Sequence, residues 1–447
     1  MTTIPICVKN EEKEIDTNNI WKDDLFDRKE VANNYTKIIK SIEQPYVLSI
    51  NARYGSGKTF FLKRWREQLR KDNEHIIFFN AWECDFVEKP LLPFLYNLLV
   101  QLKEQKLITY DFSKDLSNCQ DIIILAFKKI ISFASNGIVD IEEFNKNKNA
   151  DSIQLPKISA LEEYKQLQAT ICEFKEGLDK IVKNLGGKNL YIFIDELERC
   201  RPTFAIELLE AVKHLFNVKG IVFVLGIDRT QLKHTISNIY GCGMDGEGYL
   251  RRFIDLELEL PPVDLKIFTN YLKDKFEIKN KTKELSNNWL VGYDDFNTYF
   301  DIFSKLYDFQ LRDIEQIYYK FNVITKMIDE SELKIIPLLT LLMILKMKDF
   351  ELYQDFNLQN LKSENIQKFL NEKIINRIIN NENKRRLNHF FKICLALQPC
   401  PEDIDSTKFD NFNIDIFEIY ELENILSSNH SDLIQYLKNM ISCISIK

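Results

Sequence analysis

Four short, continuous runs of apolar residues stand out in the first half of the chain. They cover residues 46–51, 75–80, 189–194 and 220–227, and helical patterns separate them. Continuous rather than alternating runs are typical of strands buried on both faces of a parallel sheet. A fifth run, 253–260, alternates apolar and acidic residues, which indicates a strand with one solvated face. The pattern therefore predicts an α/β unit built on a parallel sheet.

The remaining sequence is predominantly helical in pattern. A helical insertion is expected between the second and third strands, at about 89–188, with an exposed loop at 145–149. After Pro262 no further strong strand pattern appears, so a domain boundary is expected there. The expected domains are 1–262, 263–345 and 346–447, the last two helical and the third of unknown role.

The turn after the first strand carries a phosphate-binding motif, which reads YVLSINARYGSGKTFF from Tyr46 to Phe61. The β- and γ-phosphates of a nucleotide need backbone N–H donors, small residues that let the main chain approach, an ammonium and a hydroxyl for Mg²⁺. A strand, this loop and a following helix provide all four. The residues expected to contact the nucleotide are Tyr54, Gly55, Ser56, Gly57, Lys58, Thr59 and Phe60.

Two side chains of this loop have separate tasks. Lys58 supplies the ammonium for the phosphates, and Thr59 supplies a hydroxyl ligand for Mg²⁺. The consensus G-x-x-x-x-G-K-[ST] would place its first glycine at Ala52. Alanine fits this position provided that its φ is negative.

A second group of polar residues follows the third and fourth strands. The segment LYIFIDE ends in Asp195 and Glu196, two carboxylates about one strand away from the loop. Asp195 is expected to hold Mg²⁺ through water, and Glu196 to polarise the attacking water as the catalytic carboxylate. Asp228 ends the next strand and is placed to sense the γ-phosphate. Arg251, Arg252 and Arg312 are candidates for compensating charge in the transition state.

Composition and charge narrow the function classes. The 447 residues are 45% hydrophobic and 28% charged, which is typical of a soluble globular protein. The net charge of −7 gives no bulk attraction to nucleic acid or to anionic membranes. Nine cysteines without a C-x-x-C pair, and no N-terminal apolar signal segment, favour reduced thiols in the cytoplasm.

Two segments could suggest other partners. The apolar stretch 122–139 contains Lys128 and Lys129 near its middle, so an amphipathic helix fits better than a membrane span. The basic segment 376–386 is best explained as a solvated helix face, given the acidic balance of the chain. Neither a membrane span nor a nucleic acid partner is therefore indicated.

Five segments together carry a more specific signal: ARYGSGKTFFLKRW, FFNAWECDF, LYIFIDELERCRP, FVLGIDRTQL and YLRRFIDLELELPP. Their combination resembles the KAP family of P-loop NTPases and spans about residues 24–262. The resemblance implies an ATPase with a parallel sheet in the strand order 5-1-4-3-2. It also implies that 263–345 is lid-like and that Arg312 is the sensor arginine of this lid.

The family resemblance also suggests a context for the activity. Family members often carry transmembrane helices inserted between the two halves of the site, whereas here the insertion keeps two lysines. Bacterial members resemble components of anti-phage defence systems. We therefore expect ATP and Mg²⁺ as cofactors, and a homo-oligomer that works with partner proteins of a defence or signalling complex. Arg199 and Arg252 are the candidates for reaching a neighbouring subunit.

Three functions remain open on the sequence. The leading hypothesis is Mg²⁺-dependent ATP hydrolysis that switches or assembles such a complex, and the alternatives are an ATP-gated scaffold with little turnover and an ATP-driven motor on nucleic acid. Glu196 favours hydrolysis over mere binding, while the acidic balance weighs against the motor. ATP is expected rather than GTP, because the nearest match to Asn-Lys-x-Asp, at 280–283, has a lysine in place of the acid.

Overall fold

The computed structural model describes the chain in segments, and the structure is reported for these alone. They are residues 15–108, 160–241, 243–276, 278, 296–327, 336–357, 368, 369, 372, 390 and 433–443. These residues fall into two compact units, one ending at Pro262 and the other starting at Val263. The expected exposed loop at 145–149, the amphipathic segment at 122–139 and the basic segment at 376–386 lie outside the described residues.

The first unit contains a five-stranded parallel sheet. Its strands are β1 (Tyr46–Asn51), β2 (His75–Asn80), β3 (Leu190–Asp195), β4 (Ile221–Ile227) and β5 (Leu256–Glu259). Their spatial order is β2-β3-β4-β1-β5, and every neighbouring pair is parallel. This confirms the predicted order. β1 and β3 are separated by β4 alone, so the residues that follow these two strands emerge at the same edge of the sheet.

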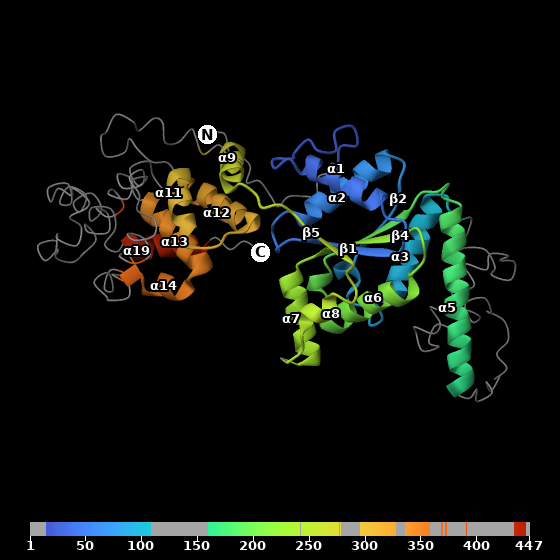
Figure 1. Cartoon of the computed structure of the whole chain (residues 1–447). Coiled ribbons are helices and arrows are strands. Elements are labelled where there is room, and N and C mark those ends of the chain that lie inside the picture. The colour runs from blue at the N-terminus through green and yellow to red at the C-terminus, as the bar shows by residue number, and fades with distance from the viewer. Residues whose placement is uncertain are drawn as a thin grey trace, which may run out of the picture. The chain divides into compact units, whose positions relative to one another are not determined.

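Helices cover both faces of this sheet (Figure 1). On one face lie α1 (Arg28–Lys40) and α2 (Lys58–Lys71), and on the other α3 (Leu91–Glu104), α5 (Ala160–Lys183) and α6 (Pro202–Leu215). Alternate residues of β3 serve the two layers, because successive side chains of a strand point to opposite faces. Tyr191 and Phe193 join the core under α1 and α2, whereas Ile192 and Ile194 join the core under α3 and α6.

A buried aromatic residue fixes the helix that follows the phosphate loop. Trp65 of α2 is fully buried, and its ring lies edge-on to Phe193 of β3 with 5.2 Å between the ring centroids. Its indole N–H donates to the Thr36 hydroxyl of α1 at 2.9 Å. A buried tryptophan needs such a partner for its polar atom. These contacts seat α2 against the middle of the sheet and so fix the position of its first turn.

The run that contains the edge strand β5 has the expected solvated acidic face, since Asp255 and Glu259 are exposed and Glu257 is half-buried. Asp255 accepts from the Val47 backbone N–H at 2.9 Å and from Lys213 at 3.1 Å. Glu257 accepts from the Asn51 amide at 3.0 Å and pairs with Arg229. The alternating pattern identified the strand, and neighbouring donors bind two acidic side chains of the run, Asp255 and Glu257, while this face stays open to solvent.

Two short helices follow β4 and complete this unit. They are α7 (Arg229–Tyr240) and α8 (Gly246–Leu250). Aspartates cap both N-termini: Asp228 accepts from the Gln231 N–H at 3.2 Å, and Asp245 accepts from the Gly248 N–H at 3.0 Å. An aspartate is a favoured N-cap because its oxygen satisfies an N–H that has no partner within the helix.

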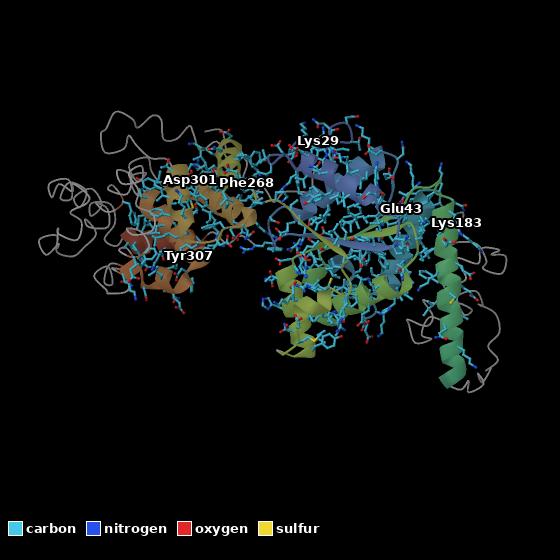
Figure 2. All side chains as sticks on the ribbon, in the orientation of Figure 1. Lys29, Glu43, Lys183, Phe268, Asp301 and Tyr307 are labelled. Carbon is cyan, nitrogen blue, oxygen red and sulfur yellow. The ribbon has the colours of Figure 1, made fainter. Side chains whose placement is uncertain are left out.

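The second unit is helical throughout its described residues. It contains α9 (Leu265–Lys275), α11 (Phe296–Phe303), α12 (Leu311–Ile324), α13 (Ile336–Lys348), α14 (Phe350–Asp355) and α19 (Leu433–Cys443). Residues 336–345 of α13 are all buried, which is typical of a central helix that others surround. Residues of all six helices share its core, and the labelled Phe268, Asp301 and Tyr307 lie in this unit (Figure 2).

Helix α13 bears on two of the expectations above. It continues through the expected boundary at 345, and Leu437 and Ile441 of α19 belong to the same core. It is also the most uniformly apolar of the described helices, yet it has only 13 residues. Within the described part of the chain, no helix has both the length and the apolar character that crossing a membrane requires.

Candidate functional site

The phosphate loop connects β1 to α2 through two glycines in left-handed backbone conformations. Gly55 has φ +79° and Gly57 has φ +90°, and Gly57 directly precedes the first residue of α2. A Cβ built on Gly57 would meet no atom within 4 Å, so the backbone conformation rather than space calls for glycine. Ala52 is not among the described residues with positive φ. The missing consensus glycine is therefore compatible with the loop.

Asp228 holds this loop from the neighbouring strand. The carboxylate is buried, and its Oδ2 accepts from the Tyr54 backbone N–H at 3.0 Å, while its Oδ1 caps α7. The Ala52 N–H also donates to the Ile227 carbonyl at 3.1 Å, which ties the start of the loop to the end of β4. Both oxygens of Asp228 therefore contact the backbone of its own chain. Its expected role in sensing the γ-phosphate stays a prediction.

The phosphate-binding lysine is paired with a carboxylate that the motif analysis did not single out. Lys58 Nζ lies 2.5 Å from Glu198 Oε1, and the two side chains are only 7% and 5% exposed. Glu198 belongs to the short 3₁₀ helix η4 (Leu197–Arg199), which follows β3. Its other oxygen, Oε2, is buried without a hydrogen-bond partner among the described residues. A phosphate at the loop would compete with Glu198 for the ammonium.

Asp195 ends β3 beneath the loop and is the most buried carboxylate of the site. It is 1% exposed, and its Oδ1 accepts from the Glu196 N–H at 2.9 Å. Burial raises the pKa of Asp195 to about 6, while the nearby Lys58 ammonium and a hydrogen bond with the Thr59 side chain oppose this rise. Beside Asp195 on the neighbouring strand β4 lies Gly226, where a Cβ would come within 2.3 Å of Leu62 Cδ1 and 2.7 Å of Asp195 Oδ1. The glycine thus leaves room for the carboxylate.

The residues at this point fit a magnesium ion. Asp195 Oδ2 is buried without a partner among the described residues, and the Thr59 side chain lies within hydrogen-bonding reach of the same carboxylate. These are hard oxygen donors, which Mg²⁺ prefers, and Mg²⁺ is usually bound by one or two carboxylates together with waters and substrate phosphates. No cluster of three or more metal-binding side chains occurs among the described residues. The donor set therefore suits a nucleotide-bound Mg²⁺ better than an all-protein metal site.

Glu196 follows Asp195 in an unusual backbone conformation. Its φ is +63°, one of four positive values at non-glycine residues in the described chain. Such conformations are unfavourable by about 1–3 kcal/mol and cluster at functional sites. The turn directs the Glu196 carboxylate to the Arg199 guanidinium at 3.0 Å. Arg199, expected as a candidate for a neighbouring subunit, is thus bound to the candidate catalytic carboxylate of its own chain.

Of the remaining predicted residues, Phe60 is the nearest to the loop. Phe60 belongs to α2, and the Arg64 guanidinium of the same helix lies over its ring, 3.5 Å from the ring centroid. Arg312 lies in the first turn of α12, in the other unit. The roles of both residues stay predictions.

Arg252 lies away from its own phosphate loop. It is exposed in the turn before β5, and the adjacent Asp255 N–H donates to the Val47 carbonyl near the start of β1. Because β1 and β5 are parallel, this turn lies at the amino ends of the strands, whereas the loop that follows Asn51 lies at their carboxyl ends. Arg252 is therefore not brought together with Lys58 and Asp195 of the same chain.

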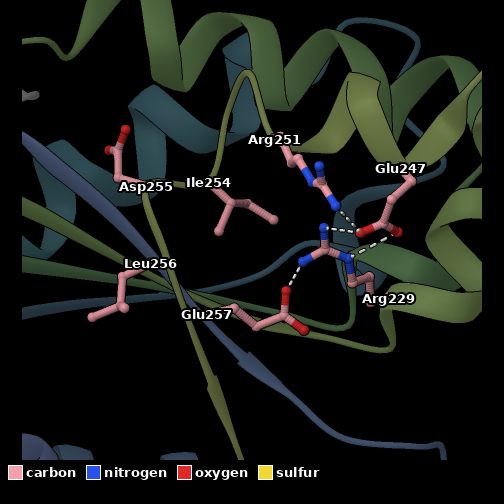
Figure 3. Close-up of a pocket in the computed structure, with 7 residues that line it drawn as sticks. All are labelled: Arg229, Glu247, Arg251, Ile254, Asp255, Leu256 and Glu257. Carbon is pink, nitrogen blue, oxygen red and sulfur yellow. Dashed lines mark hydrogen bonds and ion pairs between the residues drawn. The ribbon is translucent and has the colours of Figure 1, made fainter.

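A pocket of about 430 Å³ lies beside β5, and a cluster of charged residues forms its wall (Figure 3). Arg229, the first residue of α7, pairs with Glu247 at 2.5 Å and with Glu257, and Arg251 approaches the same Glu247 at 3.8 Å. The Arg229 N–H also donates to the Asn51 side chain at 3.1 Å. This network braces the last residue of β1, directly before the phosphate loop. Its only sequence signal was the alternating acid pattern of β5.

No curated protein matches the sequence. Solved structures similar to the chain include the Aeropyrum pernix ORC2 protein in its ADP form, with 13% identity, a TM-score of 0.33 and 93% of each chain covered. Another is Drosophila ORC bound to GC-rich DNA and Cdc6, with 12% identity, a TM-score of 0.33 and coverage of 93% of this chain and 61% of that chain. TM-scores this low support no conclusion about fold or function.

A protein-family comparison gives a clearer result. The model of the KAP family P-loop domain matches residues 28–328, well over half of the chain. The matched part includes the loop with Gly55 and Gly57, the lysine that α2 presents and the acidic end of β3. Sheet order, loop geometry and family match agree. The chain belongs to the KAP family of P-loop NTPases.

Proposed function

We propose that the protein hydrolyses ATP with the help of Mg²⁺ and uses the cycle to switch or assemble a defence or signalling complex. One observation supports hydrolysis above the others: the end of β3 brings Asp195 and Glu196 to the edge of the sheet that carries Lys58. Asp195 and Lys58 are close enough for their charges to interact. A site for binding alone has no need of the additional carboxylate of Glu196.

Each residue has a distinct task in the proposed reaction. Lys58 exchanges Glu198 for the β- and γ-phosphates, and the backbone N–H groups of 55–57 bind the phosphate oxygens. Thr59 and Asp195 would hold Mg²⁺, which when bound neutralises charge on the phosphates. Glu196 orients the attacking water and polarises it. The choice of ATP over GTP rests on the missing guanine-recognition motif.

The decisive experiment compares two variants of the full chain. Glu196→Gln should bind ATP and Mg²⁺ but stop turnover, since the amide is nearly isosteric and polarises water poorly. Lys58→Ala should lose tight ATP binding, because one ammonium compensates the β/γ-phosphates within the loop. Arg70→Gln is a matched control, since it breaks a surface ion pair with Glu67 on the same helix as Lys58. Turnover by Glu196→Gln at the wild-type rate would contradict this assignment.

The same assay separates the two alternative functions. Wild-type protein that binds ATP tightly without turnover would favour the ATP-gated scaffold. A rate that rises only when nucleic acid is added would favour the motor. The net charge of −7 supports neither nucleic acid binding nor an anionic surface as the trigger. We therefore expect turnover without nucleic acid.

A further inference from the structure

The guanidinium of Arg199 lies at the junction of three chain segments. Its centre is 4.7 Å from the ring centroid of Tyr54, in the phosphate loop, and 5.3 Å from that of Trp82, just after β2. One of its terminal nitrogens is 3.0 Å from Glu196 Oε1, just after β3. A guanidinium can stack on aromatic rings and still donate hydrogen bonds from its edge to a carboxylate. Arg199 therefore links the loop to the candidate catalytic acid.

The backbone of each aromatic residue is held by contacts of its own. The Tyr54 N–H is bound by Asp228, which also caps α7. The Trp82 N–H donates to the Asn80 side chain at 3.1 Å, and the Asn80 amide donates to Glu83 at 2.8 Å. Trp82 begins the 3₁₀ helix η1 (Trp82–Cys84) and keeps 51% of its surface exposed. Trp82 thus combines a held backbone with a half-exposed ring that lies against the Arg199 guanidinium.

The burial of Arg199 separates this arrangement from an ordinary surface ion pair. The side chain is 28% exposed, and its Nε is buried without a hydrogen-bond partner among the described residues. The Glu196 side chain is 11% exposed. A cation–π contact strengthens as water is excluded from it, whereas an exposed pair contributes little. Reach into a neighbouring subunit would require breaking all of these contacts.

We infer that Arg199 is a positioning residue. It holds the Glu196 carboxylate where this can orient and polarise the attacking water, and it couples the position of that carboxylate to the phosphate loop through Tyr54. The inference rests on the proposed hydrolysis. The left-handed backbone of Glu196 directs its side chain, and the Arg199 guanidinium then fixes where the carboxylate stands. A nucleotide that reorders the loop would move Tyr54 and, through the stack, Arg199 and Glu196.

The test is a double-mutant cycle in the full-length protein, with ATP affinity and kcat measured separately. Arg199→Gln should lower kcat by about 10- to 100-fold, the usual effect of misplacing a reacting group by about 1 Å, and leave ATP affinity unchanged. Arg199→Lys keeps the charge but not the planar fork of donors, so its kcat should lie between those of wild type and Arg199→Gln. Arg70→Gln, which breaks another Arg–Glu pair three residues apart, should leave kcat unchanged.

The cycle is completed with Glu196→Asp, which withdraws the carboxylate by one methylene. In that background Arg199→Gln should cost far less than in wild type, because the contact has already been lost. Trp82→Ala should lower kcat in the same direction as Arg199→Gln, and Trp82→Phe, which retains an aromatic face, should lower it less. A loss of ATP affinity with unchanged kcat would overturn the inference, as would equal losses in both Glu196 backgrounds.

The outcomes separate this inference from the function on which it rests. Wild-type protein without ATP turnover, or a Glu196→Asp variant with full turnover, would overturn the proposed role of Glu196 and the inference with it. Wild-type turnover that Glu196→Asp impairs and Arg199→Gln leaves intact would overturn the inference alone. Unfolding temperatures of all variants near that of wild type would show that the kcat losses arise in the folded protein.

Discussion

Burial in the fold disfavours the ionised form of the Asp195 carboxylate. A bound cation would offset this cost. The pKa of Asp195 is raised to about 6, so the folded protein retains a proton that the unfolded chain releases at about pH 4. The sign follows from linkage: stability falls as pH rises through this window, because the unfolded state then binds fewer protons than the folded state. The effect is complete once the pH exceeds the folded pKa.

This gives a prediction that needs neither nucleotide nor metal. Asp195→Asn removes the titration, so its free energy of unfolding relative to wild type should increase by up to ~3 kcal/mol between about pH 4 and pH 6. Urea unfolding at a series of pH values, followed by the fluorescence of buried Trp65, measures this difference. A difference that stays constant with pH would show that Asp195 is not buried as the structure has it.

The three strongest residue predictions and the two missed contacts differ in their physical origin. The positions of Lys58, Thr59 and Asp195 could be predicted because each depends on a local sequence pattern, a loop before a helix or an acid after a buried strand, while their roles stay predictions. The contacts of Glu198 with Lys58 and of Arg199 with Glu196 could not. They depend on the left-handed turn at Glu196, and glutamate gives no sequence signal for positive φ.

Among the secondary-structure elements, the strands were the most predictable. The apolar runs located β1 and β2 to the residue, since strands buried on both faces are almost continuously apolar, and Ser49 is the single polar residue inside these two. Their spatial order followed from the family resemblance and not from the runs, because periodicity carries no information on which strands are neighbours. The edge strand β5 proved shorter than its alternating run, as its first residues belong to the turn after α8.

The Arg229 network connects β5, α7 and α8, and its removal should weaken this corner of the sheet. Arg229 is 16% exposed, and Arg229→Met would leave Glu247 and Glu257 side by side without their shared cation. We expect a loss of about 1–3 kcal/mol in unfolding free energy, below the value for a fully buried pair because the partners are partly solvated. Urea unfolding with Trp65 fluorescence measures it.

The control for this prediction is again Arg70, which is 39% exposed and whose partner Glu67 keeps a second pair with Arg66 at 2.8 Å. Arg70→Met should change stability by no more than ~0.5 kcal/mol. Adding Glu257→Gln to Arg229→Met should restore part of the loss, because one of the two uncompensated charges is removed. Equal effects of Arg229→Met and Arg70→Met would show that the network is no stronger than a surface pair.

At the level of the whole molecule, the position of Arg252 leads to a prediction about oligomers. It lies at the amino ends of the strands, away from its own phosphate loop at their carboxyl ends, so it could compensate phosphate charge only in the site of a neighbouring subunit. Turnover per subunit should therefore rise with protein concentration, since an arginine supplied in trans can add ~10³–10⁵-fold to the rate. Steady-state ATPase assays across a dilution series measure this.

Mixing two inactive variants makes the same prediction sharper. Arg252→Ala keeps an intact loop and acids, while Glu196→Gln keeps the arginine. Mixed oligomers should recover part of the wild-type rate, because some interfaces then combine an intact site with an intact arginine. No recovery on mixing, together with a flat specific activity in a protein shown to dissociate over the dilution range, would contradict a role in trans.

The buried contact between Lys58 and Glu198 has a consequence for how the site discriminates among its ligands. Within the proposed function, a nucleotide must displace Glu198, which already lies 2.5 Å from the Lys58 ammonium. The measured affinity is then the difference between two ion pairs rather than the strength of one. A single phosphate, with few oxygens to offer the loop, gains little from that exchange, whereas a triphosphate gains from the loop N–H groups as well. The site would therefore reject small anions that are abundant in a cell.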